Sequence, residues 1–178
     1  MNLIDLPTGP DCPHIVNCVV EIAKDTGVKY EYDEEFHYFK LDRSLITSMN
    51  YPASYGFLPS TLGQDGDALD MLVYMTEPLL TGTVAEVRVL GCLDMTDGGK
   101  KDYKLIGVPT FNKHKYDDIF DLDPMFLKVT KNFFQHYKEL EGKHVIIGEW
   151  LGTDYAKDVI RRGQKRFTAH KNGEETDL

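Results

Sequence analysis

Residues 28–32 read Val28-Lys29-Tyr30-Glu31-Tyr32, a strict alternation of apolar and charged side chains. Successive side chains of a β-strand point to opposite faces, so this alternation predicts a strand with one apolar and one charged face. The turn-forming acids Asp33-Glu34-Glu35 follow, and residues 36–41 then read as the second strand of a hairpin. This part of the chain therefore favours a strand-rich fold.

Further strands are predicted on both sides of the hairpin. They cover residues 14–22, 69–74, 83–93, 104–108 and 143–150. Helices are predicted late in the chain, where Asp123-Pro124 has the pattern of a helix cap followed by proline at the first helical position. A second helix is predicted to begin near Thr153-Asp154. Many short strands before two late helices favour an α+β fold, a small β-barrel with helices packed outside it.

No internal repeat or linker divides the chain. Its 178 residues, 42% of them hydrophobic, suffice for one compact core. We expect residues 1–168 to form a single domain and the polar segment 169–178 to be a flexible tail. No secretory signal is recognisable at the N-terminus, and no apolar run approaches the roughly 20 residues needed to cross a membrane.

The overall charge argues against a nucleic-acid partner. The formal charge is −9, from 20 Lys and Arg against 29 Asp and Glu, whereas a duplex-binding surface requires the opposite sign. Three cysteines, Cys12, Cys18 and Cys92, have no paired spacing. They predict reduced thiols in a cytoplasmic protein, not a disulfide framework or a zinc site.

Three acids lie within the six residues Asp65-Gly66-Asp67-Ala68-Leu69-Asp70. The apolar run 69–75 overlaps the end of this segment, so the acids belong to a loop that enters a buried strand. Carboxylates this close repel one another unless a cation lies among them, and hard divalent cations such as Mg²⁺ take oxygen ligands. The segment, called the acid loop below, predicts a metal-binding edge of the kind that serves phosphate chemistry.

A second group of acids surrounds a pair of glycines. Asp94 and Asp97 precede Gly98-Gly99, and Asp102 follows. Paired glycines permit a tight reversal, which would bring Asp97 and Asp102 together at the ends of neighbouring strands. With the acid loop they would line one cavity able to hold more than one metal. Taken alone, the two residues have the pattern of ordinary solvated turn acids.

Basic residues accompany these acids, among them Lys29, Arg43 and Lys104. Alternating acids and bases can be surface ion pairs, each contributing only about 0–1 kcal/mol. In the mouth of a barrel the same residues can hold phosphate oxygens. Their combination with clustered carboxylates favours a phosphate site.

These segments together resemble the soluble family I inorganic pyrophosphatases, nearly end to end. The matching motifs occur in order between residues 21 and 138: Lys29-Tyr30-Glu31, Asp42-Arg43, Tyr51-Pro52 with Tyr55-Gly56, the acid loop, Met95-Thr96-Asp97 with Asp102 and Lys104, and His136-Tyr137-Lys138. The resemblance implies a five-stranded barrel of the oligonucleotide-binding type with flanking helices. It also implies hydrolysis of pyrophosphate to two phosphates with several Mg²⁺ ions, and a homo-oligomer, commonly a hexamer.

The resemblance implies a role for each matching position. The metal ligands would be Asp65, Asp70 and Asp102 for the tightest metal, Asp97 for a metal that arrives with the substrate, and Glu31 directly or through water. A water shared by two metals would be the nucleophile, and Asp67 would accept its proton. The groups holding the phosphoryl units would be Lys29, Arg43, Tyr55, Lys104, Tyr137 and Lys138. Glu21 matches a supporting acid, and Tyr51 matches a supporting hydroxyl near the acid loop.

The chain departs from the family pattern at two positions. Ala68 stands in the acid loop where proline is usual, which leaves that loop freer. Gly98 stands where many bacterial members have another acid, which removes a possible metal contact.

Three other functions compete with this one. A calcium-binding EF-hand loop counted from Asp65 needs an acid or Asn, Gly and Glu at its fifth, sixth and twelfth positions, which hold Leu69, Asp70 and Thr76. A single-strand-binding barrel needs a basic groove, whereas this chain is acidic. A metal-dependent phosphohydrolase acting on a nucleotide or another phosphate ester remains an alternative, although no GxxxxGK[ST] or GxGxxG segment is present.

Overall fold

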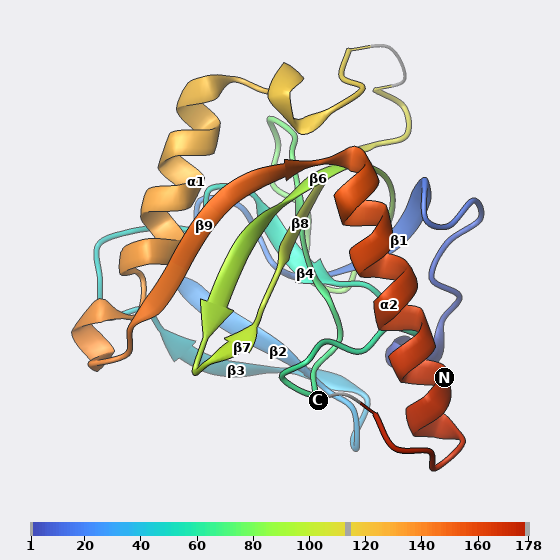
Figure 1. Cartoon of the computed structure of the whole chain (residues 1–178). Coiled ribbons are helices and arrows are strands. Elements are labelled where there is room, and N and C mark those ends of the chain that lie inside the picture. Colours follow the sequence, from blue (N-terminus) through green and yellow to red (C-terminus); the bar gives the residue numbers. More distant parts are fainter. Residues whose placement is uncertain (1, 113–114, 177–178) are drawn as a thin grey trace.

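A closed ring of five strands forms the core of the computed structural model, which describes residues 2–112 and 115–176 (Figure 1). Around the ring the order is β1 (Ile15–Ile22), β4 (Ser54–Phe57), β5 (Asp70–Val73), β8 (Lys104–Pro109) and β6 (Val84–Asp97). β5 and β8 run parallel, and all other neighbours in the ring are antiparallel. Because β1 also pairs with β6, the ring closes, and the predicted five-stranded barrel is confirmed.

The longest strand, β6, has 14 residues and pairs with four other strands. Along one edge, β1 pairs with residues 84–88 and β9 (Val145–Gly152) with residues 91–97. β8 and the short β7 (Lys100–Lys101) pair along the opposite edge. The prediction ended this strand at residue 93, but Met95 continues the buried pattern opposite Ile147 and extends the strand to Asp97.

The predicted hairpin is confirmed as a separate two-stranded sheet of β2 (Val28–Asp33) and β3 (Tyr38–Ser44). Its second strand begins two residues later than predicted because residues 34–37 form the turn. The Asp33 carboxylate closes this turn by accepting the backbone N–H of Phe36 at 2.9 Å. Lys29 lies opposite Arg43 in the register, so the hairpin carries two basic residues side by side.

Two helices flank the strands, as predicted, and Figure 1 shows them on either side of the barrel. In α1 (Pro124–His136) the Asp123 carboxylate caps the N-terminus by accepting the backbone N–H of Met125 at 2.8 Å. α2 (Thr153–Lys171) extends three residues into the segment 169–178 predicted as a tail. The flexibility of that segment stays a prediction. Within residues 2–112 and 115–176, no helix combines the length and apolar character needed to cross a membrane.

Side chains of the barrel strands alternate between two buried clusters. Leu72 of β5 belongs to the cluster that includes Phe133 of α1, whereas its neighbour Met71 belongs to the cluster that includes Ile160 of α2. The described residues also include three short 3₁₀ helices, η1 (Leu3–Asp5), η2 (Ile119–Asp121) and η3 (Glu139–Glu141). α1 ends at His136, and Leu140 is exposed in η3.

The sequence analysis missed strand β4, which has only four residues, all of them buried. Gly56 explains how this strand fits into the ring. A Cβ at this position would lie 1.9 Å from the backbone oxygen of Val19 in β1, so only glycine allows the two backbones to approach. Gly56 is therefore required by the packing of β4 against β1, and its neighbour Tyr55 lies in the site described below.

Candidate active site

The acid loop connects β4 to β5 and is folded by its own hydrogen bonds. The backbone N–H of Gly63 donates to the Asp67 carbonyl at 2.6 Å, and the Asp65 carboxylate accepts the backbone N–H of Asp67 at 3.2 Å. Leu69 is buried beneath the loop, and Asp70 is the first residue of β5. The apolar run thus anchors the loop, and the three carboxylates lie at the end of the strand as predicted.

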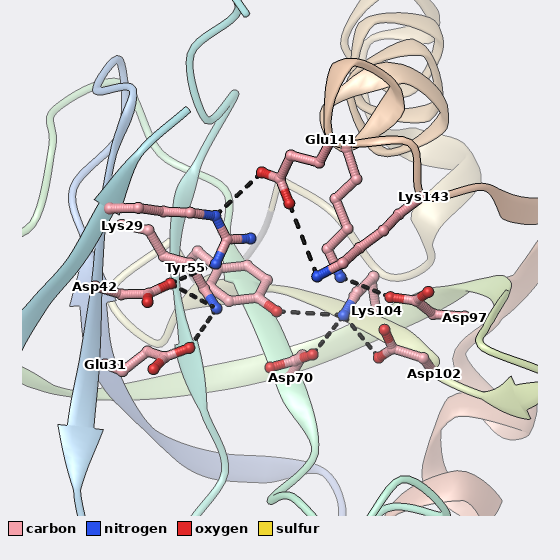
Figure 2. Close-up of polar contacts among 12 residues, drawn as sticks. Lys29, Glu31, Asp42, Tyr55, Asp70, Asp97, Asp102, Lys104, Glu141 and Lys143 are labelled. Atoms are coloured by element: carbon pink, nitrogen blue, oxygen red, sulfur yellow. Dashed lines mark hydrogen bonds and ion pairs between the residues drawn. The ribbon is translucent and has the colours of Figure 1, made fainter. Parts of the chain in front are cut away.

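Lys104 lies at the centre of the site and is only 2% exposed. The parallel register places it directly beside Asp70, and Asp102 lies two residues earlier in the chain. Its ammonium donates to Asp70, to Asp102 at 2.6 Å and to the Tyr55 hydroxyl at 3.2 Å, as Figure 2 shows. Burial opposes the charge on Lys104, but Asp70 and Asp102 outweigh it and raise the pKa of the ammonium well above its ordinary value. Lys104 therefore stays cationic.

The predicted reversal at the paired glycines is present. Gly98 and Gly99 have φ values of 55° and 84°, which glycine adopts without strain, and β7 then folds back on β6. Asp97 ends β6 and accepts a hydrogen bond from Lys138 at 2.6 Å. Asp97 and Asp102 are thereby brought to the acid loop's end of the barrel, whereas Asp94 pairs with Lys101 instead.

The hairpin supplies another wall of the site. Lys29 forms an ion pair with Glu31 on the same strand, and its ammonium lies 3.6 Å from Asp42 on β3. Asp42 also accepts a hydrogen bond from Arg43. Lys29 and Glu31 share one face of β2, as their spacing predicted.

Aromatic rings form the floor below these charges. Tyr51 packs against Tyr55 and Phe133, with ring centroids 5.4 and 4.8 Å away. Tyr137, at the end of α1, packs on Phe133 at 5.2 Å. All three tyrosine side chains are buried, so α1 fixes their positions.

One cavity of about 500 Å³ brings these segments together. Its lining includes every predicted site residue except Arg43: Glu21, Lys29, Glu31, Tyr51, Tyr55, Asp65, Asp67, Asp70, Asp97, Asp102, Lys104, Tyr137 and Lys138. Arg43 lies on β3 beside Lys29 and hydrogen-bonds to Asp42 and Glu141. Its place is the rim of the site, not the wall.

The cavity destabilises negative charge on its acid loop. Burial raises the pKa of Asp65, and the Asp102 carboxylate raises it further. Burial likewise raises the pKa of Asp67, with Asp65 and Glu31 adding to the effect. Acids in this condition favour the binding of cations among them.

Glu21 leads to a prediction about pH. Its carboxylate accepts the backbone N–H of Tyr32 at 2.7 Å, but burial raises its pKa from 4.5 to about 8. Between these values the folded chain keeps a proton that the unfolded chain loses. The resulting stability is complete below the unfolded pKa and is lost as pH rises towards 8. In chelator, we expect Glu21→Gln to remove this loss, up to about 1.4 kcal/mol per pH unit.

Urea unfolding of both proteins between pH 5 and pH 8 measures this effect. The free energy of unfolding of the wild type should fall relative to that of the variant as pH rises. Parallel profiles would contradict the raised pKa of Glu21.

The acidic side chains of the cavity have the chemistry of a metal-binding donor set. Their carboxylate oxygens are the ligands that Mg²⁺ prefers, and they come from several separate segments around one cavity. In the described ranges, no three acidic, histidine or cysteine side chains are close enough to hold an ion as they stand. Lysines engage several of the acids instead, Lys104 with Asp70 and Asp102, and Lys138 with Asp97. The chemistry of the residues fits Mg²⁺, with lysines compensating the carboxylates.

Two residues near the site were given no role by the sequence analysis. Asp42 belongs to a quoted motif but received no function, although it contacts both Lys29 and Arg43. Glu141 accepts a hydrogen bond from Arg43 across 98 residues of chain. No local pattern marks such a long-range pair.

Comparisons with known proteins agree with this geometry. The family model described as inorganic pyrophosphatase matches residues 18–168. An inorganic pyrophosphatase of Sulfolobus acidocaldarius is 45% identical over 171 residues, which cover 92% of this chain and 97% of the relative. A soluble inorganic pyrophosphatase of Zea mays is 42% identical over 161 residues, covering 88% of this chain and 74% of the relative.

Solved structures give the same result. The inorganic pyrophosphatase of Thermus thermophilus superposes with a TM-score of 0.90 at 40% identity, covering 94% of this chain and 99% of that one. That of Helicobacter pylori has a TM-score of 0.86 at 36% identity, covering 92% and 98%. The family model spans most of the chain, and the relatives match over nearly their whole length or most of it. The chain therefore belongs to the soluble family I inorganic pyrophosphatases and is an inorganic diphosphatase.

Proposed function

We propose that this protein hydrolyses inorganic pyrophosphate to two orthophosphates, with several Mg²⁺ ions in the cavity and Asp67 as the general base. One observation carries the proposal: acids from the acid loop, β6 and the β7–β8 connection line the same cavity as Lys29, Lys104 and Lys138. A highly charged diphosphate needs cations around it and a base beside the attacking water. Carboxylates that can bind cations and serve as a base, and lysines that can hold phosphate, line the same cavity.

Asp65, Asp70 and Asp102 are the proposed ligands of the tightest metal, with Asp97 and Glu31 for further ions. When bound, Mg²⁺ supplies neutralisation of the phosphate charge and a lower pKa of the attacking water. With Asp70 and Asp102 engaged as metal ligands, the Lys104 ammonium would be free to hold a phosphoryl oxygen. The lysines thus balance the carboxylates before the metal and the substrate bind, and would balance phosphate charge afterwards.

The reaction breaks one bond and forms one. The water oxygen attacks one phosphorus, the bond from that phosphorus to the bridging oxygen breaks, and the proton of the water passes to Asp67. The oxygens of the two phosphoryl units are held by Lys29, Arg43, Tyr55, Lys104, Tyr137 and Lys138. Glu21 and Tyr51 support the wall of the cavity from behind. A carboxylate base suits a water already acidified by metal.

The remaining parts of the proposal concern the whole molecule. We propose that residues 1–168 are one catalytic domain and that the protein works in the cytoplasm as a homo-oligomer, with a hexamer expected from the family resemblance. The free cysteines Cys12, Cys18 and Cys92 fit a reducing compartment. The mass in solution, measured by light scattering, tests the hexamer.

Phosphate release from pyrophosphate, ATP and a phosphate monoester tests the activity, each with Mg²⁺, Ca²⁺ or chelator. We expect release from pyrophosphate alone, and only with Mg²⁺, because Ca²⁺ is larger and less rigidly coordinated. Equal release from the monoester would instead favour a general phosphohydrolase, the alternative that the sequence left open. Undiminished release in chelator would exclude the metal-dependent reaction.

A further inference from the structure

Arg43 presents a problem for the proposed phosphate site. It is assigned to the substrate, yet it lies at the rim on a two-stranded hairpin, with 30% of its side chain exposed. A free arginine side chain loses about 2 kcal/mol of rotamer entropy when it is ordered. A rim arginine therefore binds a phosphate well only if the fold holds its guanidinium in place beforehand.

Glu141 provides such a contact. Its Oε1 accepts a hydrogen bond from Nε of Arg43 at 3.1 Å, and its side chain is only 12% exposed. Asp42 accepts a second hydrogen bond, from Nη1. Hydrogen bonds from two different nitrogens to two carboxylates fix the plane of the guanidinium. The third nitrogen, Nη2, donates no hydrogen bond to any of the described residues. In Figure 2 a dashed line from the labelled Glu141 carboxylate marks the hydrogen bond to Arg43.

The position of Glu141 is itself fixed relative to the substrate-binding residues. Its backbone N–H donates to the carbonyl of Lys138 at 3.0 Å, and Gly142 ends η3 with a φ of 71°. The N–H of Gly142 donates to the Glu139 carbonyl at 3.0 Å. Glu141 is therefore one short helical turn from Lys138, whose side chain lines the cavity.

We propose that Glu141 is a positioning residue for pyrophosphate binding: its carboxylate locks the Arg43 guanidinium at the rim so that a free N–H edge is presented to a phosphoryl oxygen. The same contact ties the hairpin to the segment that carries Tyr137 and Lys138, so the two sides of the phosphate site keep a constant separation. This inference rests on the proposed function. It assigns Glu141 no contact with the substrate.

Steady-state kinetics of Glu141→Ala, Glu141→Gln, Arg43→Ala and the Glu141→Ala/Arg43→Ala double variant test the inference. We expect Glu141→Ala to raise KM for magnesium pyrophosphate about tenfold, the loss of one charge-assisted contact, with kcat nearly unchanged. In Glu141→Gln the amide oxygen still accepts from Nε, so most of the affinity should return. In the Arg43→Ala background, removing Glu141 should have no further effect on KM.

Glu139→Ala is the matched control, because Glu139 lies in the same 3₁₀ helix, is exposed and pairs with His136 at 2.9 Å. It should leave KM unchanged. Independent effects of Glu141→Ala and Arg43→Ala on KM would overturn the inference, as would a lowered Tm and kcat with KM unchanged. If Glu141→Ala fails to fold, KM of Glu141→Gln decides, since a rise as large as that of Arg43→Ala also overturns it. A wild type without pyrophosphatase activity would instead remove the proposed function itself.

Discussion

Asp67→Asn is expected to lower the turnover number for pyrophosphate by about 10²–10⁴-fold, the usual contribution of a general base. The amide cannot accept the proton of the attacking water, but it has almost the same shape as the carboxylate. The loop should keep its fold, because the contacts that close it use the backbone N–H and carbonyl of Asp67. Mg²⁺ affinity, measured by titration calorimetry, should therefore change little.

Asp70→Asn is the comparison that separates the two kinds of carboxylate. Asp70 is a proposed metal ligand and contacts Lys104, so its variant should lose both Mg²⁺ affinity and turnover. A near-native rate in Asp67→Asn would remove Asp67 from its role as base. Equal losses of Mg²⁺ affinity in the two variants would make Asp67 a ligand instead.

Lys104→Met is expected to lower the free energy of unfolding in chelator by about 3–5 kcal/mol, the cost of leaving two partly buried carboxylates without their buried partner. Methionine fills a similar volume, so the loss reports charge and not a cavity. Asp70 and Asp102 would then face each other uncompensated beneath the site. Because such acids take up protons more readily when folded, the stability of the variant should recover as pH falls.

Urea unfolding with and without Mg²⁺ measures this loss. Added Mg²⁺ should restore more stability to Lys104→Met than to the wild type, because the metal replaces the missing positive charge. Lys101→Met is the matched control, since Lys101 is 41% exposed and pairs with Asp94 at the surface. Its effect should stay within about 1 kcal/mol. Similar losses of unfolding free energy in the two variants would show that the buried ion pairs of Lys104 stabilise the protein no more than an exposed pair does.

The strands with clear patterns could be predicted from the sequence, and their pairing could not. The alternation in β2 and the apolar runs of β5 and β8 mark strands locally, and Asp123-Pro124 marks the start of α1. β4 was missed because its residues, Ser54-Tyr55-Gly56-Phe57, lack an apolar run like that of β5, and β7 was missed because it has only two residues. The closure of β1 on β6 from residues 15–19 to 84–88 has no local signal. A small barrel was expected from the order of strands and helices, and its five strands were expected from the family resemblance.

Most of the candidate site was found by motif, and the departures gain a physical meaning from the structure. Gly98 has a φ of 55°, a backbone conformation that glycine adopts without strain. This position therefore lacks a carboxylate but lets the chain reverse without strain. Ala68 packs against the cluster of Ile4 and Phe57, which supports the acid loop from below. Glu141 could not be found, because its pairing with Arg43 depends on where η3 lies after folding.

The many partners of β6 have a consequence for how the molecule comes apart. Both of its edges are occupied along the strand, by β1 and β9 on one side and by β8 and β7 on the other. Detaching β6 would break its pairing with four other strands at once, so we expect the barrel to lose its structure as one cooperative unit. The β2–β3 hairpin is a separate sheet and does not depend on this pairing.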